Sequence, residues 1–219
     1  HKKAQHLSKL EDAGIPAGRE SGFYVPVTER DRDAVAVLLK EASSRLGRDM
    51  PKERTVLINP GSKNHLKKWP PASYARLADM LSSEKGCAVL VTGADEDRDT
   101  VEAITGAVTG PVVDICSRTS VGALAELMRR AGAVITGDSA PLHVASAVGT
   151  PTVAIFGPTD ERIYGPLAPG SVVLKPSETC RPCGKGHCDE KGPDGCIDGV
   201  KVSEVYQAAC RVLEGEWER

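Results

Sequence analysis

Short runs rich in Val, Ile and Leu alternate along this chain with longer amphipathic segments, and this alternation restricts the possible fold more than any other feature. The runs predict buried strands, and the segments between them carry apolar residues at helical spacing. Strands that are joined through helices pair in parallel, and a parallel sheet is covered by helices on both faces. The sequence therefore predicts an α/β fold with one parallel sheet.

The expected elements follow one another in a regular order. The predicted strands are Val56–Ile58, Ala88–Thr92, Val112–Asp114, Ala133–Thr136, Thr152–Phe156 and Val172–Leu174. The predicted helices are His1–Asp12, Arg30–Leu46, Ala72–Ser83, Asp97–Val108, Val121–Ala131, Leu142–Val148 and Val202–Leu213. In such sheets the ligand binds at the carboxyl ends of the strands. The loops at those ends are thus where functional residues are expected.

One polar loop, residues 137–143, follows the predicted strand that ends at Thr136 and leads into a helix of small residues. The N–H groups at a helix start carry partial positive charge and favour an anion such as phosphate. Asp138 adds a carboxylate that suits sugar hydroxyls, and Ser139 and His143 add a hydroxyl and an imidazole. These groups predict a nucleotide-sugar site. Two plainer alternatives are a simple helix cap at Asp-Ser-Ala-Pro and a core histidine.

A second loop follows the predicted strand Val56–Ile58. It reads Asn-Pro-Gly-Ser and then contains Lys63, Lys67 and Lys68. A phosphate site needs backbone N–H donors and a cation, and Gly61 allows the backbone to approach the ligand closely. The spacing differs from that of a Walker loop, and Gly-x-Gly-x-x-Gly does not occur in the sequence. The loop is therefore a candidate phosphate site, with a solvated charged surface as the alternative.

Two further polar segments follow predicted strands. Residues 92–97, Thr-Gly-Ala-Asp-Glu-Asp, offer a carboxylate that could accept hydrogen bonds from ribose, or acids that cap the next helix. Residues 117–120, Ser-Arg-Thr-Ser, could line a base pocket. Within that segment Ser120 is predicted to be mainly the N-cap of the following helix.

Four of the seven cysteines cluster in a segment rich in Gly, Pro, Lys and Asp. Such a segment buries too little apolar surface to order itself, so a structural zinc ion is one interpretation. Free thiols are the other, because the second pair is spaced more widely than in a zinc knuckle. The candidate metal ligands are Cys180, Cys183, Cys188 and Cys196.

The composition argues against several other classes of protein. The net charge of −2 provides no broad basic surface for nucleic acid, and the 4% aromatic content argues against a base-stacking platform. No apolar run approaches the ~20 residues that span a bilayer, and no signal-peptide pattern stands at the start. We therefore expect a soluble protein with no nucleic-acid partner.

The two loops together resemble a known family. The strings NPGSKNHLKKWP and TGDSAPLHVASAVGTPTVAIFGPT look like the two signature blocks of the heptosyltransferases, the family-nine glycosyltransferases of lipopolysaccharide core assembly. The resemblance covers about residues 55–165. It implies a Rossmann-like sheet that forms the C-terminal, donor-binding half of a GT-B type glycosyltransferase. Residues 1–50 would then be the tail of the N-terminal acceptor domain with linker helices, and residues 51–219 the donor domain with a Cys-rich loop at 180–196.

The resemblance implies an inverting transfer of a heptose from ADP-heptose to the lipopolysaccharide inner core. Lys67 would neutralise the departing diphosphate, with Lys68 as a close substitute, and Asp138 would hold the heptose. Asp95 matches the ribose-binding acid, and Thr119 matches a residue of the base pocket. The residues expected to contact the donor are Gly61, Ser62, Lys67, Lys68, Asp95, Thr119, Asp138, Ser139, Ala140, Pro141 and His143.

Some parts of that reaction are expected outside this chain. The general base is unknown and is implied to lie in the missing half, so we expect this chain alone to transfer nothing. No catalytic metal or other cofactor is expected, because lysine and helix dipoles can supply the charge and Asp95-Glu96-Asp97 is a poor metal motif. The lipopolysaccharide core would bind through the missing half. The resemblance implies a cytoplasmic protein with a peripheral contact at the inner face of the inner membrane.

Three alternatives stay open at this point. A nucleotide-sugar epimerase of related architecture would bind the same donor. A nicotinamide oxidoreductase would share the alternating pattern, although the glycine fingerprint is missing. A non-catalytic nucleotide-binding module that engages a protein partner would bind nucleotide without regard to the sugar.

Overall fold

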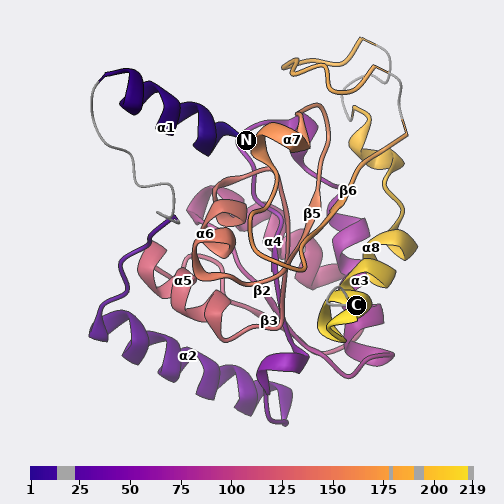
Figure 1. Ribbon diagram of the computed structural model, residues 1–219. Coiled ribbons are helices and arrows are strands. Elements are labelled where there is room, and N and C mark those ends of the chain that lie inside the picture. Colours follow the sequence, from indigo (N-terminus) through magenta and orange to yellow (C-terminus); the bar gives the residue numbers. More distant parts are fainter. Residues whose placement is uncertain (14–22, 178–179, 190–194, 217–219) are drawn as a thin grey trace.

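The computed structural model describes residues 1–13, 23–177, 180–189 and 195–216. Its centre is a six-stranded parallel sheet in the order β3-β2-β1-β4-β5-β6 (Figure 1). The strands are β1 Thr55–Asn59, β2 Ala88–Val91, β3 Val112–Asp114, β4 Ala133–Gly137, β5 Thr152–Ile155 and β6 Val172–Leu174. The predicted α/β architecture and all six predicted strands are confirmed, with ends that differ by one residue at most.

Eight α-helices accompany the sheet in the described ranges. They are α1 Lys2–Asp12, α2 Glu29–Leu46, α3 Pro71–Ser83, α4 Arg98–Ala107, α5 Val121–Arg129, α6 Ala140–Val148, α7 Glu161–Tyr164 and α8 Val202–Leu213. Seven of them were expected, and the short α7 was not. Helix α6 begins two residues before the predicted start, because Pro141 fits the first turn of a helix.

The helices cover both faces of the sheet, as predicted. Apolar side chains of α3, α4 and α8 pack with alternate strand residues such as Val56 and Ile58 in the larger core. The intervening residues, such as Leu57, point to the other face and pack against α2, α5 and α6. The four central strands β2, β1, β4 and β5 are buried along their whole length, which explains why they read as continuous apolar runs in the sequence.

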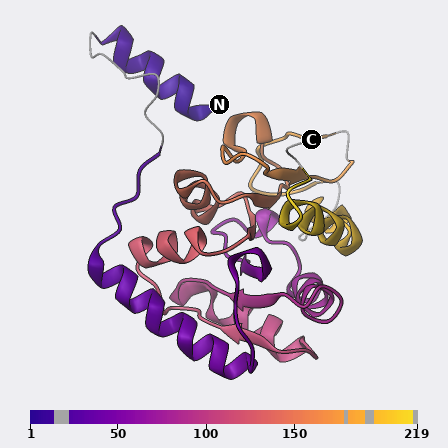
Figure 2. The ribbon, with the colours of Figure 1, turned by 60° about the horizontal axis from the view of Figure 1, so that its bottom comes forward.

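Helix α2 packs as part of this folded unit. Val35, Leu38 and Ala42 are buried against the face of the sheet that α5 also covers, and Figure 2 shows α2 running along that side of the molecule. Helix α1 lies apart from the sheet in Figures 1 and 2. A boundary at residue 50 stays a prediction, since α2 precedes it and is packed into the core.

The strand order creates the position for a site. The chain adds β2 and β3 on one side of β1, and then adds β4, β5 and β6 on the other side. The loops after β1 and β4 therefore diverge in opposite directions, and a crevice forms between them at the carboxyl ends of the strands. Among the described helices, none is both long and apolar enough to cross a membrane.

Candidate functional site

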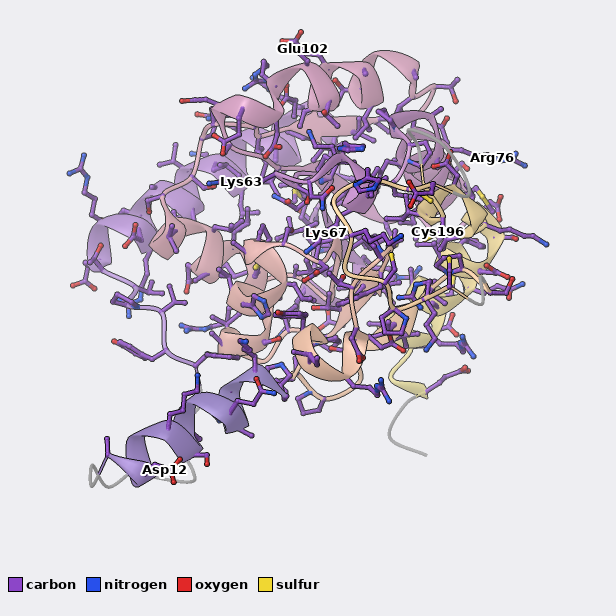
Figure 3. All side chains as sticks on the ribbon, turned by 90° about the horizontal axis from the view of Figure 1, so that it is seen from above. Asp12, Lys63, Lys67, Arg76, Glu102 and Cys196 are labelled. Atoms are coloured by element: carbon purple, nitrogen blue, oxygen red, sulfur yellow. The ribbon has the colours of Figure 1, made fainter. Side chains whose placement is uncertain are left out.

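A cavity of about 810 Å³ opens at the carboxyl ends of the first four strands. Its volume lies within the range of small-molecule sites. Four strand-end loops and the helix starts that follow them form the wall. The lining residues are Asn59, Gly61, Ser62, Lys63, Asn64, Lys67, Lys68, Thr92, Gly93, Ala94, Glu96, Asp97, Thr119, Ser120, Val121, Leu124, Asp138, Ser139, Ala140, Pro141 and Val144. Figure 3 looks down on this end of the molecule, with Lys67 near the middle.

The loop after β1 is shaped by two asparagines. The Asn59 side chain accepts a hydrogen bond from the Gly61 N–H at 3.2 Å, and the Asn64 side chain accepts one from the Leu66 N–H at 3.0 Å. Such side-chain-to-backbone bonds are typical of Asx turns. The second bond starts a 3-10 turn, His65–Lys67, which brings Lys67 to the cavity.

Trp69 fastens the far end of the same loop to the core. Its indole N–H donates to the Val200 carbonyl at 3.0 Å, and its ring meets Tyr74 edge-on with centroids 4.9 Å apart. The side chain is fully buried, and an aromatic anchor of this kind keeps the adjacent backbone in place. Lys67, the last residue of the 3-10 turn, and Lys68 thus lie directly before this anchor.

Lys67 and Asp138 meet across the crevice. The Lys67 ammonium lies 2.6 Å from Asp138 Oδ2, and the Thr159 hydroxyl donates to the same oxygen at 2.7 Å. Asp138 is buried, whereas 22% of the Lys67 side chain is exposed. A buried carboxylate needs such partners, and the exposed side of the ammonium stays open toward the cavity. The Asp138 carboxylate is thus bonded across the crevice, and the N-cap of the helix behind it is Ser139.

Helix α6 begins directly beside this pair. Ser139 is its N-cap residue, and Ser139, Ala140 and Pro141 all line the cavity. The Ser139 hydroxyl lies 3.3 Å from that of Thr136. The positive end of the helix dipole thus points at the cavity, which favours a phosphate there.

The acidic segment after β2 contributes residues other than the one expected. Glu96 and Asp97 line the cavity, whereas Asp95 is exposed outside its wall. The Asp97 carboxylate accepts a hydrogen bond from the Ala94 N–H at 3.0 Å, as a residue at a helix start does. Gly61 packs so close to Asp97 that a Cβ there would lie 2.6 Å from Asp97 Cγ.

The loop after β3 provides the apolar part of the cavity. Val121 and Leu124 of α5 line it together with Thr119. Ser120 is the N-cap of α5, because its hydroxyl accepts from the Ala123 N–H at 3.0 Å, so this prediction is confirmed. A flat apolar base would suit this part of the wall.

The structure brings together nine of the residues that the sequence suggested for the donor. These are Gly61, Ser62, Lys67, Lys68, Thr119, Asp138, Ser139, Ala140 and Pro141. Asp95 and His143 are outside the lining. The His143 ring is half-buried and lies 6.1 Å from that of Phe23. Sequence reasoning named Lys63 only as part of the lysine-bearing loop, and Glu96 and Asp97 only as part of the acidic segment, and it did not single out Asn64.

The four clustered cysteines do not form a metal site as described. Cys180 and Cys183 are exposed and Cys196 is buried, and no three His, Cys, Asp or Glu side chains of the described ranges are placed to hold a metal. The zinc interpretation therefore stays a prediction without support from the geometry.

Sequence comparison identifies the family of this chain. Residues 23–193 match glycosyltransferase family 9, the heptosyltransferase family, and this match covers more than half of the chain. The chain belongs to glycosyltransferase family 9. The matched region contains all six strands and every residue that lines the cavity.

Two curated relatives in family 9 illustrate the similarity. Lipooligosaccharide heptosyltransferase 2 of Haemophilus influenzae is 32% identical over 113 residues, which are 50% of this chain and 32% of that protein. Lipopolysaccharide heptosyltransferase 3 of Escherichia coli K12 is 29% identical over 168 residues, which are 76% of this chain and 46% of that protein. The chain thus spans only about a third to a half of the length of these relatives.

Solved structures show the same fold. A family 9 glycosyl transferase from Veillonella parvula superposes with a TM-score of 0.82 at 25% identity, covering 98% of this chain and 60% of that one. An E. coli heptosyltransferase solved with ADP gives a TM-score of 0.59 at 17% identity, covering 78% of this chain and 48% of that one. The Rossmann-like sheet of this chain is therefore the one found in GT-B heptosyltransferases.

Proposed function

We propose that this chain is the donor-binding part of an inverting glycosyltransferase that takes a heptose from ADP-heptose. The observation that carries the proposal is the Lys67–Asp138 pair, which lies where helix α6 points into a cavity of about 810 Å³. A cation, a helix start and a sugar-binding carboxylate are what a nucleoside diphosphate sugar needs. Membership of the heptosyltransferase family supports heptose, and the similar E. coli heptosyltransferase that was solved with ADP supports an ADP-sugar.

Each part of the wall has a role in this proposal. Lys67 and the start of α6 bind the diphosphate, and they stabilise the charge that grows on it as the bond to the sugar breaks. Asp138 accepts hydrogen bonds from the heptose hydroxyls. Thr119, Val121 and Leu124 contact the adenine, and Glu96 lies on the wall where a carboxylate could accept bonds from the ribose.

The acceptor side belongs to the same proposal. The chain spans less than half of the length of the two relatives described above, and we therefore assign the lipopolysaccharide core and the general base to a part of the enzyme outside this chain. Residues 1–50 would lead from that part, and residues 51–219 would form the donor domain. We place the reaction in the cytoplasm, at the inner face of the inner membrane. We expect the chain alone to bind donor without transferring its sugar.

Calorimetric titration with ADP, UDP, GDP and ADP-heptose tests the proposal directly. We expect binding of ADP in preference to the other two nucleotides, and tighter binding of ADP-heptose than of ADP. A preference for UDP or GDP would still be consistent with a glycosyltransferase, but it would rule out ADP-heptose as the donor. Equal affinity for ADP and ADP-heptose would instead indicate a nucleotide-binding module that does not recognise the sugar.

Two variants then assign the roles. Lys67→Met removes a charged hydrogen-bond donor to phosphate, which is worth about 1.5–3 kcal/mol, or roughly 10- to 100-fold in the affinity for ADP. Lys52→Met is the matched control, because Lys52 is an exposed lysine outside the cavity lining and its loss should cost about threefold or less. Asp138→Asn should remove the preference for ADP-heptose over ADP.

Product analysis separates the transferase from an epimerase. The chain is incubated with ADP-heptose and no acceptor, and the sugar is then analysed for configuration. We expect an unchanged donor. Conversion to a stereoisomer would indicate an epimerase and overturn the proposed reaction.

A further inference from the structure

The guanidinium of Arg181 is buried, although the residue belongs to the Gly/Pro/Cys-rich segment. Only 4% of its side chain is exposed, whereas its neighbours Pro182 and Cys183 lie at the surface. A buried charge is costly unless its donors are paired. The segment thus directs one arginine into the protein, and the partners of that arginine indicate its role.

The arginine bonds to the loop that joins β5 to α7. Its Nε donates to the Gly157 carbonyl, and its Nη2 donates to the Thr159 carbonyl at 3.0 Å. The same Nη2 lies 3.5 Å from Glu161 Oε2. The planar fork of a guanidinium suits several acceptors at once, and here it holds two residues of the loop and the first residue of α7.

Glu161 is the ionic partner at the end of this series. Burial raises the pKa of this carboxyl, but the hydrogen bond from Lys175 and the charges of Lys175 and Arg181 outweigh burial, so the pKa lies below its usual value. Glu161 is therefore charged near neutral pH, and it keeps the guanidinium in place.

The loop that Arg181 holds reaches the proposed sugar site from two sides. Thr159 donates to Asp138 Oδ2 at 2.7 Å, which is the oxygen that also receives Lys67. Gly157 packs against the backbone just before Lys67, since a Cβ at Gly157 would lie 2.5 Å from the Leu66 carbonyl oxygen. A shift of this loop would therefore change the orientation of the Asp138 carboxylate. It would also change the packing against the backbone that precedes Lys67.

We propose that Arg181 is a positioning residue for the sugar site, which acts by holding Thr159 against Asp138. The inference rests on the proposed function, because it gives the heptose to Asp138. The proposal also gives the cysteine-rich segment a role at the site. The segment carries Arg181, which fixes the orientation of the Asp138 carboxylate, and this role does not require a metal.

The first test compares the affinities for ADP and for ADP-heptose in Arg181→Met. We expect the preference for ADP-heptose over ADP to fall toward that of Asp138→Asn, with a smaller change in the affinity for ADP itself. Arg181→Lys keeps the charge but loses the fork, and should give an intermediate preference. The matched control is Arg162→Met, because Arg162 lies on α7 with 79% of its side chain exposed and pairs with Asp160. An unchanged preference in folded Arg181→Met would overturn the inference.

A double-mutant cycle with Thr159→Val tests whether the arginine acts through the threonine. If it does, the two substitutions together should reduce the sugar preference by little more than either one alone. Full additivity would overturn the proposed connection. A merely structural role would lower the thermal midpoint and the affinity for ADP together, and would leave the sugar preference unchanged.

A readout without ligand separates this inference from the proposed function. The carboxyl carbon of Asp138 is labelled and its NMR signal is assigned with Asp138→Asn. We expect Arg181→Met and Thr159→Val to shift this signal in the same direction, and Arg162→Met to leave it in place. An unshifted signal in Arg181→Met would overturn the inference. A wild-type chain that does not prefer ADP-heptose would overturn the proposed function, while this signal would still decide the role of Arg181.

Discussion

The carboxylate of Asp97 fills the space in which Gly61 would carry a side chain, because a Cβ on that glycine would lie 2.6 Å from Asp97 Cγ. The two residues come from the loops after β2 and β1. Asp97 is held in place by the Ala94 N–H at 3.0 Å, so it has little freedom to move away. The contact brings two walls of the cavity together, and the loop after β1 needs a glycine at this point for that reason.

Gly61→Ala should therefore damage both stability and binding. The added methyl group must displace a buried carboxylate or the loop itself, and overpacking of this kind costs about 1–3 kcal/mol. We expect a lower denaturation midpoint and weaker binding of ADP, since Ser62 and Lys67 follow in the same loop. Denaturant unfolding and calorimetry measure the two effects.

Gly106→Ala is the matched control for that substitution. Gly106 lies in helix α4, and a Cβ there meets no atom within 4 Å. An exposed helical alanine is more stable than glycine by up to about 1 kcal/mol, so this variant should unfold at a slightly higher midpoint and bind ADP normally. Equal stability of the two variants would show that Asp97 yields to the methyl group.

The segment after β2 allows two neighbouring acids to be compared. Glu96 lines the cavity and Asp95 does not. If the Glu96 carboxylate binds the ribose, Glu96→Ala should weaken the binding of ADP by about tenfold, since a charged hydrogen bond is worth roughly 1.5 kcal/mol or more. Asp95→Ala should change the affinity by less than about twofold, as expected for a surface substitution. The reverse ranking in calorimetry would restore Asp95 as the ribose-binding residue and would require a rearranged loop.

The bond between Asp31 of α2 and Ser120 at the start of α5 should make the stability of the fold depend on pH. The hydrogen bonds from Ser120 and Thr28 lower the pKa of Asp31 from 3.8 to about 2. Because the pKa is lower in the folded state, the charged form stabilises the fold above about pH 4, and this contribution is lost as the pH falls through 2. The difference in unfolding free energy between wild type and Asp31→Asn should thus be constant near neutral pH and shrink below pH 4.

Denaturant unfolding at a series of pH values measures that difference. Asp33→Asn on the same helix is the matched control, because its side chain is exposed and its loss should change stability by less than about 0.5 kcal/mol. A difference between Asp31→Asn and wild type that persists unchanged down to pH 2.5 would contradict the assignment.

Most of the fold could be predicted from the sequence, because the spacing of apolar residues in the sequence matches the side chains that are buried in the structure. Val56 to Ile58 reads as a buried strand, and it is one, since both faces of the sheet are covered. Ser120 reads as a helix cap and is one. The short helix Glu161–Tyr164 was missed because four residues are too few to show a helical period.

The sequence predicted only those residues of the site that lie in loops at the carboxyl ends of strands. Lys67, Asp138 and Ser139 were found in this way. Nothing in the sequence shows that the Thr159 hydroxyl reaches Asp138. Arg181 lies in a segment without any periodic pattern, so its burial depends on tertiary contacts alone.

The pairing of β1 with β4 has a consequence for how the molecule acquires its site. These two strands lie side by side in the sheet, yet β2 and β3 with their helices separate them in the chain. The loop that carries Lys67 and the loop that carries Asp138 can face each other only after this distant pairing has formed. Nucleotide affinity during refolding should therefore rise late and in one step, and proteolytic fragments that contain only one of the two strands should have none.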